Sequence, residues 1–325
     1  MEMVLQLVLL VAGFVALIKG ADIFVDGSSS LAAIFKVPSV IIGLTIVALG
    51  TSAPELAVSA SAALKGSNEI ALSNVIGSNL FNLLMVLGVC ALIQPVPIEP
   101  VIKKRDFPFS IIITVLLFVT LGIGAVTMVD FSAVQMSDNV SEVSRLMGII
   151  LLLVMVAYIA VLIVSARKNP SESEPVKMMT PLKSVLFILL GVALIIAGGQ
   201  FVVNSAKFIA AVFGMSETLI GLTVVAFGTS LPELVTSIVA SRKGENGLAV
   251  GNVVGSNIFN LLLILGVSAT LHSIPVNLAS LLDFVILIVA SFLVYLFSLT
   301  KKINRAEGVL MILMYAATVV FAALR

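Results

Sequence analysis

Long apolar stretches, separated by short polar connections, follow one another along the whole chain. Each stretch is long enough to cross the hydrocarbon core of a bilayer as a helix, which takes about 20 residues. The pattern therefore predicts an all-α polytopic membrane protein with ten transmembrane helices. The predicted helices span residues 3–33, 38–64, 70–93, 107–128, 146–166, 182–212, 217–240, 248–271, 278–299 and 308–324.

The composition agrees with a membrane setting and excludes several classes of protein. Hydrophobic residues make up 60% of the chain and charged residues 11%, and the mean hydropathy is +1.23. The sequence has one cysteine, Cys90, and one histidine, His272, which excludes a disulfide framework and a Cys/His metal cluster. It has no nucleophile–base pattern and no phosphate-binding glycine loop, so we predict neither an enzyme nor an ATP-driven pump. It implies no cofactor, no nucleic acid and no protein partner.

Two blocks of sequence occur twice. Residues 43–56 recur as 221–234, and residues 75–82 recur as 253–260, with a constant offset of 178 residues (233 minus 55). An odd number of helices in each repeat makes the second repeat enter the bilayer from the opposite side, so the repeats are related by an axis in the membrane plane. The predicted units are a first five-helix repeat (1–166, motif 43–90), a cytoplasmic linker (167–181) and a second five-helix repeat (182–325, motif 221–268).

The basic residues test this topology independently. Of the 18 lysines and arginines, 13 fall on connections that share one side of the predicted bilayer, whereas the other side holds Lys65, Arg145 and Arg325. Basic residues accumulate on the cytoplasmic side of membrane proteins, so we expect both termini outside. The predicted cytoplasmic set is Lys36, Lys103, Lys104, Arg105, Arg167, Lys168, Lys177, Lys183, Arg242, Lys243, Lys301, Lys302 and Arg305.

Each copy of the first block places a carboxylate beside a proline in the middle of a predicted span: Glu55 follows Pro54, and Glu233 follows Pro232. Proline lacks an N–H and its ring clashes with the carbonyl four residues earlier, so the second and seventh helices must break there. In hydrocarbon, the freed carbonyls are tolerated only where protein or a hydrated ion satisfies them. Carbonyls, hydroxyls and carboxylates are the hard oxygen donors that Ca²⁺ and Na⁺ prefer. The pair predicts a cation site where the repeats meet.

A second interpretation of the same residues is a capping box. Ser52 with Glu55, and Ser230 with Glu233, have the Ser-x-x-Glu spacing in which the glutamate only closes a helix start. We favour the cation site because both glutamates lie mid-span and occur in duplicate. The two roles can also coexist.

A polar stripe follows each motif on the next helix. Asn74, Ser78 and Asn82 lie on one helical face, and the copy has Asn252, Ser256 and Asn260. Hydrogen bonding between helices is the alternative role for such residues in membranes. For Asn74, Asn79, Asn252 and Asn257 both roles stay open, whereas Ser78, Asn82, Ser256 and Asn260 are favoured as ion-facing, partly because of the resemblance described below.

Asp22 and Asp26 on the first predicted helix correspond to Gln200 and Asn204 in the second repeat. The loss of charge in the copy argues against an essential symmetric role. An alternative role for the two aspartates is to line an outer vestibule of the protein. The acidic loop between the fourth and fifth helices is expected to be a solvated surface.

The two motifs resemble those of the cation/calcium antiporter superfamily, in its sodium/calcium exchanger branch. The matching cores are Gly-Thr-Ser-Ala-Pro-Glu at 50–55 and Gly-Thr-Ser-Leu-Pro-Glu at 228–233, each followed by Gly-Ser-Asn-(Leu/Ile)-Phe-Asn at 77–82 and 255–260. The resemblance implies ion ligands at the carbonyls of Ala48 and Ala226 and at the side chains of Thr51, Ser52, Glu55, Ser78, Asn82, Thr229, Ser230, Glu233, Ser256 and Asn260.

The resemblance implies a Na⁺/Ca²⁺ antiporter in a plasma membrane of prokaryotic type, with Ca²⁺ and Na⁺ as its transported partners. A proton/calcium exchanger is the alternative, and a channel or a membrane scaffold are hypotheses of other classes. Several relatives, including potassium-dependent ones, have aspartate where this chain has Asn260, so we expect exchange that does not require K⁺. If the family's usual three Na⁺ replace one Ca²⁺, we also expect exchange to be electrogenic. The linker is too short for the calcium-sensing domain of animal exchangers. The family's proposed access switch, a sliding first and sixth helix, predicts a movable pair at the edge of the bundle.

Overall fold

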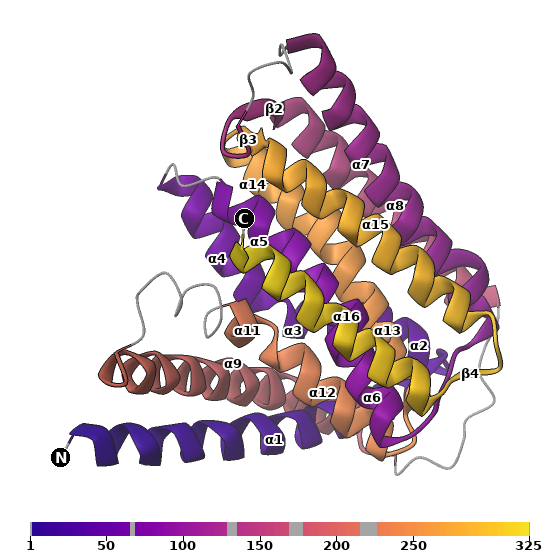
Figure 1. The fold of residues 1–325 in the computed structure, drawn as a ribbon. Coiled ribbons are helices and arrows are strands. Elements are labelled where there is room, and N and C mark those ends of the chain that lie inside the picture. Colours follow the sequence, from indigo (N-terminus) through magenta and orange to yellow (C-terminus); the bar gives the residue numbers. More distant parts are fainter. Residues whose placement is uncertain (1, 66–68, 129–134, 169–177, 215–225, 325) are drawn as a thin grey trace.

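The computed structural model describes residues 2–65, 69–128, 135–168, 178–214 and 226–324, with the backbone alone at 69, 70, 126–128 and 226 (Figure 1). In this part of the chain, eight helices are long and apolar enough to cross a membrane, and two further helices with a bend of 49° between them form a ninth candidate span. The predicted seventh span begins outside the described residues and continues as α11 (Ala226–Thr229) and α12 (Leu231–Arg242). The ten-helix count therefore stays a prediction.

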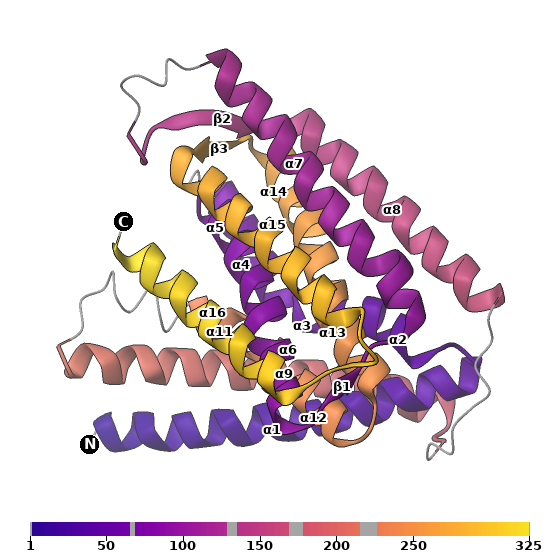
Figure 2. The same cartoon turned by 45° about the vertical axis from the view of Figure 1, so that its right-hand side comes forward.

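The two longest helices, α1 (Glu2–Phe35) and α9 (Pro181–Val212), lie side by side and cross one edge of the bundle obliquely (Figures 1 and 2). They run antiparallel, because Gly13 faces Gly198 whereas Gly20 faces Gly191. A Cβ on Gly13 would lie 2.9 Å from the Gly198 carbonyl oxygen, so only glycine permits this approach. At 34 and 32 residues, both helices exceed a core of about 30 Å and must tilt.

The centre of the molecule consists of three interrupted helices. The first is α2 (Ser39–Ile42), the π-helical turn η1 (Gly43–Val47), α3 (Ala48–Thr51) and α4 (Ala53–Leu64). The second is α5 (Glu69–Leu80), η2 (Phe81–Val86) and α6 (Leu87–Ile93), and the third is α13 (Asn246–Phe259), η5 (Asn260–Ile264) and α14 (Leu265–Leu271). Together with α11 and α12, these segments hold most of the buried polar residues in the described part of the chain.

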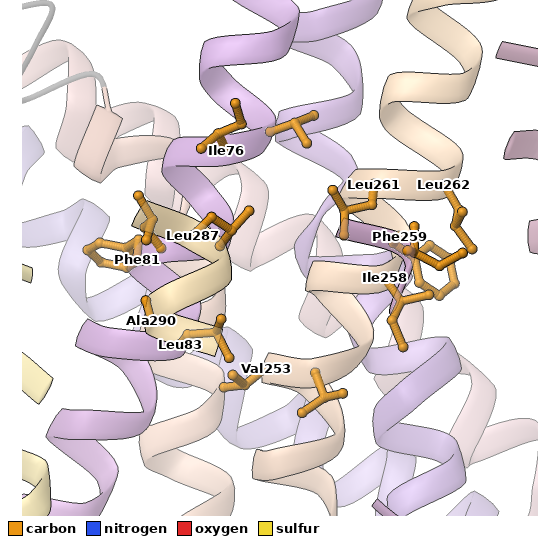
Figure 3. Close-up of a cluster of buried hydrophobic side chains, with 14 of the residues drawn as sticks. Ile76, Phe81, Leu83, Val253, Ile258, Phe259, Leu261, Leu262, Leu287 and Ala290 are labelled. Carbon is orange, nitrogen blue, oxygen red and sulfur yellow. The ribbon is translucent and has the colours of Figure 1, made fainter. Parts of the chain in front are cut away.

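Close backbone crossings and an apolar core hold the central helices together. Gly255 of α13 packs on the first interrupted helix, where an added Cβ would lie 2.8 Å from Leu44 Cα. Its counterpart Gly77 is exposed and has no atom within 4 Å of an added Cβ, so only Gly255 of this pair makes a close approach. Figure 3 shows the core, in which Phe81 from η2 and Ile258 from α13 belong to one cluster that also includes Leu287 of α15 (Leu278–Ser298).

The remaining helices brace the centre in a crossed pattern. Gly308 of α16 (Arg305–Leu324) packs on Gly88 of α6, and Gly148 of α8 (Arg145–Lys168) packs on Gly266 of α14. Gly88 and Gly266 are themselves 178 residues apart. Each helix that was predicted as fifth in its repeat therefore packs on the third helix of the other repeat. The interrupted span Ile102–Ala125, comprising η3 (Ile102–Asp106) and part of α7 (Phe107–Met128), packs beside α15.

Short strands, absent from the predicted all-α pattern, tie the connections of the two halves together. β1 (Val96–Pro97) pairs antiparallel with β4 (Lys302–Ile303), and β2 (Asn139–Val143) pairs antiparallel with β3 (Ile274–Asn277). Part of the acidic connection, expected to be a solvated loop, is thus the strand β2. Segments of two to five residues are too short for an alternating hydrophobic pattern to reveal.

Three connections that were predicted to be cytoplasmic meet at one end of the bundle. The Gln94 amide donates to the Ser241 carbonyl, Val96 pairs with Ile303, and Lys103 donates to the carbonyl of Thr300. Figure 1 shows β4, α6 and the end of α12 at this end, opposite β2 and β3. The strands and side-chain contacts bring these basic connections together, as the charge pattern requires.

Asp22 and Asp26 lie at that same end. Lys243 Nζ, at the end of α12, is 2.6 Å from Asp26 Oδ1 and 3.1 Å from Asp22 Oδ1. Lys243 belongs to a connection predicted to be cytoplasmic, so this contact is incompatible with an outer vestibule for the aspartates if the predicted orientation holds. We call this cluster the Lys243 clamp.

Candidate cation site

Both proline motifs interrupt their helices where the sequence requires. The first interrupted helix stops at Thr51, Ser52 takes φ −83° and ψ 5°, and α4 begins at Ala53. The second copy has the same geometry, with φ −94° and ψ 6° at Ser230 and α12 beginning at Leu231. Each proline lies at the second position of the new helix, where its missing N–H costs nothing. The break aims the serine and the glutamate of each motif into the middle of the bundle.

The serine of each motif contacts the glutamate of the other motif. Ser52 Oγ donates to Glu233 Oε1 (2.9 Å), and Ser230 Oγ donates to Glu55 Oε1 (3.0 Å). Neither serine makes a side-chain capping hydrogen bond to its own helix. The capping-box interpretation of Ser52 and Ser230 is therefore wrong, and the two copies of the motif meet face to face through these crossed hydrogen bonds.

The polar stripe reaches the same point. Ser256 Oγ donates to Glu233 Oε1 at 3.4 Å, and Ser78 Oγ lies 3.1 Å from Ser230 Oγ. Asn82 and Asn260 follow one turn further along their helices and are buried. All four stripe residues predicted to face the ion are therefore buried, and the two serines contact the hydrogen-bonded cluster of the carboxylates.

The site contains buried oxygens that no described residue satisfies. Glu55 and Glu233 are each 1% exposed, and neither carboxylate has a lysine or arginine partner among the described residues. Unpaired polar groups are rare in protein interiors because desolvation is costly, so these oxygens are suited to bind a cation. The unpaired buried atoms at the site are Glu55 Oε2, Glu233 Oε2, Thr229 Oγ1, Asn82 Oδ1, Asn82 Nδ2, Asn257 Oδ1 and Asn260 Oδ1.

Two predicted ligands differ from expectation in detail. The Ala48 carbonyl accepts the Ser52 N–H at 3.0 Å, so the helix break does not free it as predicted, although a carbonyl has a second lone pair. Thr51 Oγ1 donates to Asn252 Oδ1 at 3.0 Å, so its hydroxyl also joins two helices. Ala226 opens α11, and its side chain lies outside the described residues.

The asparagines whose role was open turn out to hold helices together. Asn74 Nδ2 donates to Ser59 Oγ (2.9 Å), and Asn252 Nδ2 donates to Ser237 Oγ (3.0 Å). In each case the bond joins a half-helix that carries a glutamate to the helix that follows it. Asn79 and Asn257 each donate to the other's main-chain carbonyl at 3.3 Å.

Sequence reasoning missed two features of the site. The π-helical turns η2 and η5 begin at or next to Asn82 and Asn260, and such turns often mark functional sites. Phe81, Phe227 and Tyr315 form a cluster of edge-on rings beside α11, with centroids 5.1 to 5.7 Å apart. The exchange of Leu49 for Phe227 between the motif copies was the only trace of this cluster in the sequence.

The donor set defines the class of site. It consists of two carboxylates, with hydroxyl and amide oxygens, and no group of three or more His, Cys, Asp or Glu residues occurs in the described part of the chain. Such a set suits a hard alkali or alkaline-earth cation. Buried at the centre of a multi-pass membrane bundle, it has the character expected of the site of a cation transporter.

Comparison with known proteins agrees with this class. The sequence matches the family "Sodium/calcium exchanger protein" over residues 5–164 and 183–324, and the chain belongs to this family. It is 37% identical to CaxA of Alkalimonas amylolytica (96% of this chain, 97% of CaxA) and 32% identical to the sodium/calcium exchanger MaX1 of Methanosarcina acetivorans (96% and 97%). The solved structure of the sodium–calcium exchanger NCX_Mj, soaked with Na⁺ and Ca²⁺, superposes with a TM-score of 0.81 at 30% identity, covering 99% of both chains. The protein is an integral membrane cation/Ca²⁺ exchanger, not an enzyme.

Proposed function

We propose that this protein is a Na⁺/Ca²⁺ antiporter that works by alternating access. The observation that carries the proposal is the crossed pair of Ser52–Glu233 and Ser230–Glu55 hydrogen bonds, with a free oxygen on each glutamate. Two carboxylates give the site a charge of −2, which one Ca²⁺ neutralises. Several Na⁺ ions could occupy the same oxygens instead, so binding is mutually exclusive and exchange follows.

Flux in reconstituted vesicles tests this function. Vesicles loaded with Na⁺ should take up Ca²⁺ when they are diluted into Na⁺-free buffer, and uptake should saturate with Ca²⁺. Uptake that ignores the Na⁺ gradient but follows a pH gradient would instead establish a proton/calcium exchanger. Flux that never saturates would indicate a channel.

The full arrangement that we propose is two inverted five-helix repeats with both termini outside and the basic connections in the cytoplasm. The matched contacts at an offset of 178 residues support it, because Asn79 with Asn257, and the two crossed serines, are what a two-fold axis in the membrane plane would generate. The proposed ligands are the carbonyls of Ala48 and Ala226 and the side chains of Thr51, Ser52, Glu55, Ser78, Asn82, Thr229, Ser230, Glu233, Ser256 and Asn260.

The two amides in this set bear on ion stoichiometry. With neutral Asn82 and Asn260, a site that holds one Ca²⁺ is balanced, and a K⁺ bound beside it would be uncompensated in a medium of low dielectric constant. Exchange is therefore expected without K⁺. If three Na⁺ replace one Ca²⁺, the surplus charge makes transport electrogenic, with about 2.3 kcal/mol per 100 mV. Na⁺-driven Ca²⁺ flux at clamped voltage, with and without K⁺, tests both statements.

We propose that α1 and α9 move together as the access element. The close glycine packing between them favours movement as one body, and their position at the edge of the bundle leaves room for it. The pair does make polar contacts with the centre: the Lys243 clamp joins α1 to the half-helix that carries Glu233. Cross-linking α1 and α9 to the central helices should stop exchange. Undiminished exchange after complete cross-linking would refute the movement.

A further inference from the structure

Asn79 connects the main chain of α13 to the side chain of Asn260. Its Nδ2 donates to the Asn257 carbonyl oxygen (3.3 Å), and its Oδ1 accepts from Asn260 Nδ2 (2.9 Å). Both ends of the Asn79 side chain are therefore used, at a residue that is 1% exposed. Asn260 is equally buried, and its Oδ1 has no partner.

These hydrogen bonds allow only one orientation of the Asn79 and Asn260 amides. A main-chain carbonyl can only accept, so the Asn79 amide must turn its NH₂ toward Asn257. Its oxygen then faces Asn260, which must in turn present its own NH₂. The free end of Asn260 is therefore an oxygen. A flipped Asn260 amide would place two acceptors against each other and leave a buried NH₂ unsatisfied.

The position of Asn260 along its helix places the residue close to the carboxylates. Asn260 is one helical turn beyond Ser256, and Ser256 contacts Glu233. An oxygen there attracts a cation, whereas an NH₂ in the same place would repel it. The direction of the Asn260 amide thus decides whether the residue helps or opposes cation binding.

The matching chain at Asn82 is incomplete in this structure. Asn257 Nδ2 donates to the Asn79 carbonyl (3.3 Å), as symmetry requires. However, Asn257 Oδ1 has no partner, and neither Oδ1 nor Nδ2 of Asn82 has one. One of the two amides is therefore locked with its oxygen free, and the other is not held.

We propose that Asn79 is a positioning residue that fixes the Asn260 amide with its oxygen toward the transported cation. The inference deepens the proposed function, because it requires that the site binds Ca²⁺. Asn79 itself does not touch the ion. It transmits the polarity of a backbone carbonyl, which cannot flip, to a side-chain amide, which otherwise could.

Equilibrium binding of ⁴⁵Ca²⁺ to the purified full-length protein tests the proposal separately from transport. Asn79→Leu removes both side-chain hydrogen bonds while keeping the same number and branching of side-chain heavy atoms, and it should raise the apparent Kd for Ca²⁺ about tenfold, the effect of one buried hydrogen bond. The same substitution in an Asn260→Ala background should add less than about twofold, because the residue through which it acts is gone. In flux assays, Asn79→Leu should raise KM far more than it lowers kcat.

Asn257→Leu is the matched control. It also removes a 3.3 Å hydrogen bond between the same two helices, but it keeps the main-chain carbonyl on which Asn79 is anchored. Its effect on Kd should be the same with Asn260 present or absent. If Asn79→Leu fails to fold, as judged by thermal unfolding in detergent, Asn79→Ser serves instead, since its short side chain does not reach Asn260.

The outcomes are distinct. If the wild-type protein does not bind Ca²⁺, the proposed function fails. If the wild type binds Ca²⁺ and Asn79→Leu binds it equally well, or weakens binding by the same factor with and without Asn260, the positioning role is overturned while the function stands. Coupling of Asn257→Leu to Asn260 would likewise overturn it.

Discussion

The two copies of the motif have the same residues at the centre but different surroundings. At the carboxylates the copies match: each serine binds the other copy's glutamate, at 2.9 and 3.0 Å. Away from the carboxylates they differ. Asn260 is held by Asn79, whereas Asn82 is not held. Near-identical sequence therefore gives matching hydrogen bonds at the crossed serines and at the Asn74–Ser59 and Asn252–Ser237 pairs, but not at Asn82 and Asn260.

The largest difference lies at the edge of the bundle. α1 packs along α12, burying Phe24 and Ala240 in one apolar cluster, and the Lys243 clamp closes the end of this contact. The equivalent helices, α9 and α4, make no comparable contact among the described residues. A two-fold repeat that exchanges these two arrangements would open the site alternately to each side. We propose that the ion site is common to both access states and that the contacts between α1 and α12 define one of them.

The largest expected effect is at the carboxylates. Glu55→Gln and Glu233→Gln keep the size of the side chain but leave Ca²⁺ in a site one charge short of neutral. Na⁺-driven Ca²⁺ flux should fall more than about 100-fold in both variants, because an uncompensated charge in a low-dielectric interior is costly. Asp22→Asn, which removes an exposed carboxylate, should keep most of the activity. Wild-type rates in either glutamine variant would contradict the cation site.

The crossed serines should come next, and their effects should be equal. Ser52→Ala and Ser230→Ala each remove a hydrogen bond to a carboxylate, an interaction worth about 1.5–3 kcal/mol. The apparent Kd for Ca²⁺ should rise at least about tenfold in both. Ser59→Ala is the control, because Ser59 lies on α4 but bonds Asn74 instead of a glutamate. Clearly unequal effects of the two serine variants would show that the centre is not symmetric.

A smaller, structural effect is expected between α1 and α9. A Cβ at Gly198 would lie 2.7 Å from the Gly13 carbonyl oxygen, whereas at the adjacent Gly199 the nearest atom would be 3.9 Å away. Gly198→Ala should destabilise the pair by about 1–3 kcal/mol, the usual cost of overpacking, and lower the melting temperature. Gly199→Ala should leave it unchanged. Equal melting temperatures would argue against a rigidly packed pair.

The smallest effect is expected at the Lys243 clamp. Its three side chains are 29%, 42% and 50% exposed, and such surface ion pairs contribute about 0–1 kcal/mol. Lys243→Gln should shift the ratio of apparent Ca²⁺ affinities at the two membrane faces by about twofold, and the shift should shrink at high salt. Lys65→Gln, at the equivalent position of the first repeat, should not shift it. A larger shift for Lys65→Gln than for Lys243→Gln would contradict the proposal that the bundle is held closed at the end near Lys243.

The sequence predicted much of the site because its residues repeat. Glu55, Ser52 and their copies could be assigned from the duplicated block, and the breaks at Pro54 and Pro232 follow from proline's missing N–H. The crossed pairing of the serines could not be predicted, because Ser-x-x-Glu has the same spacing as a capping box. The π-helical turns, the short strands and the Asn79–Asn260 contact also lay beyond the sequence, since each depends on a neighbour far away in the chain.

The sequence by itself determined the membrane setting, the family and the identity of the buried oxygens, because hydropathy, charge bias and the repeated block are local properties of the chain. Tertiary structure alone decided which donor forms a hydrogen bond with which of these oxygens. Ser52 and Glu233 are 181 residues apart, as are Asn79 and Asn260. Whether a hydroxyl caps its own helix or a distant carboxylate depends on which acceptor the packed bundle brings within about 3 Å.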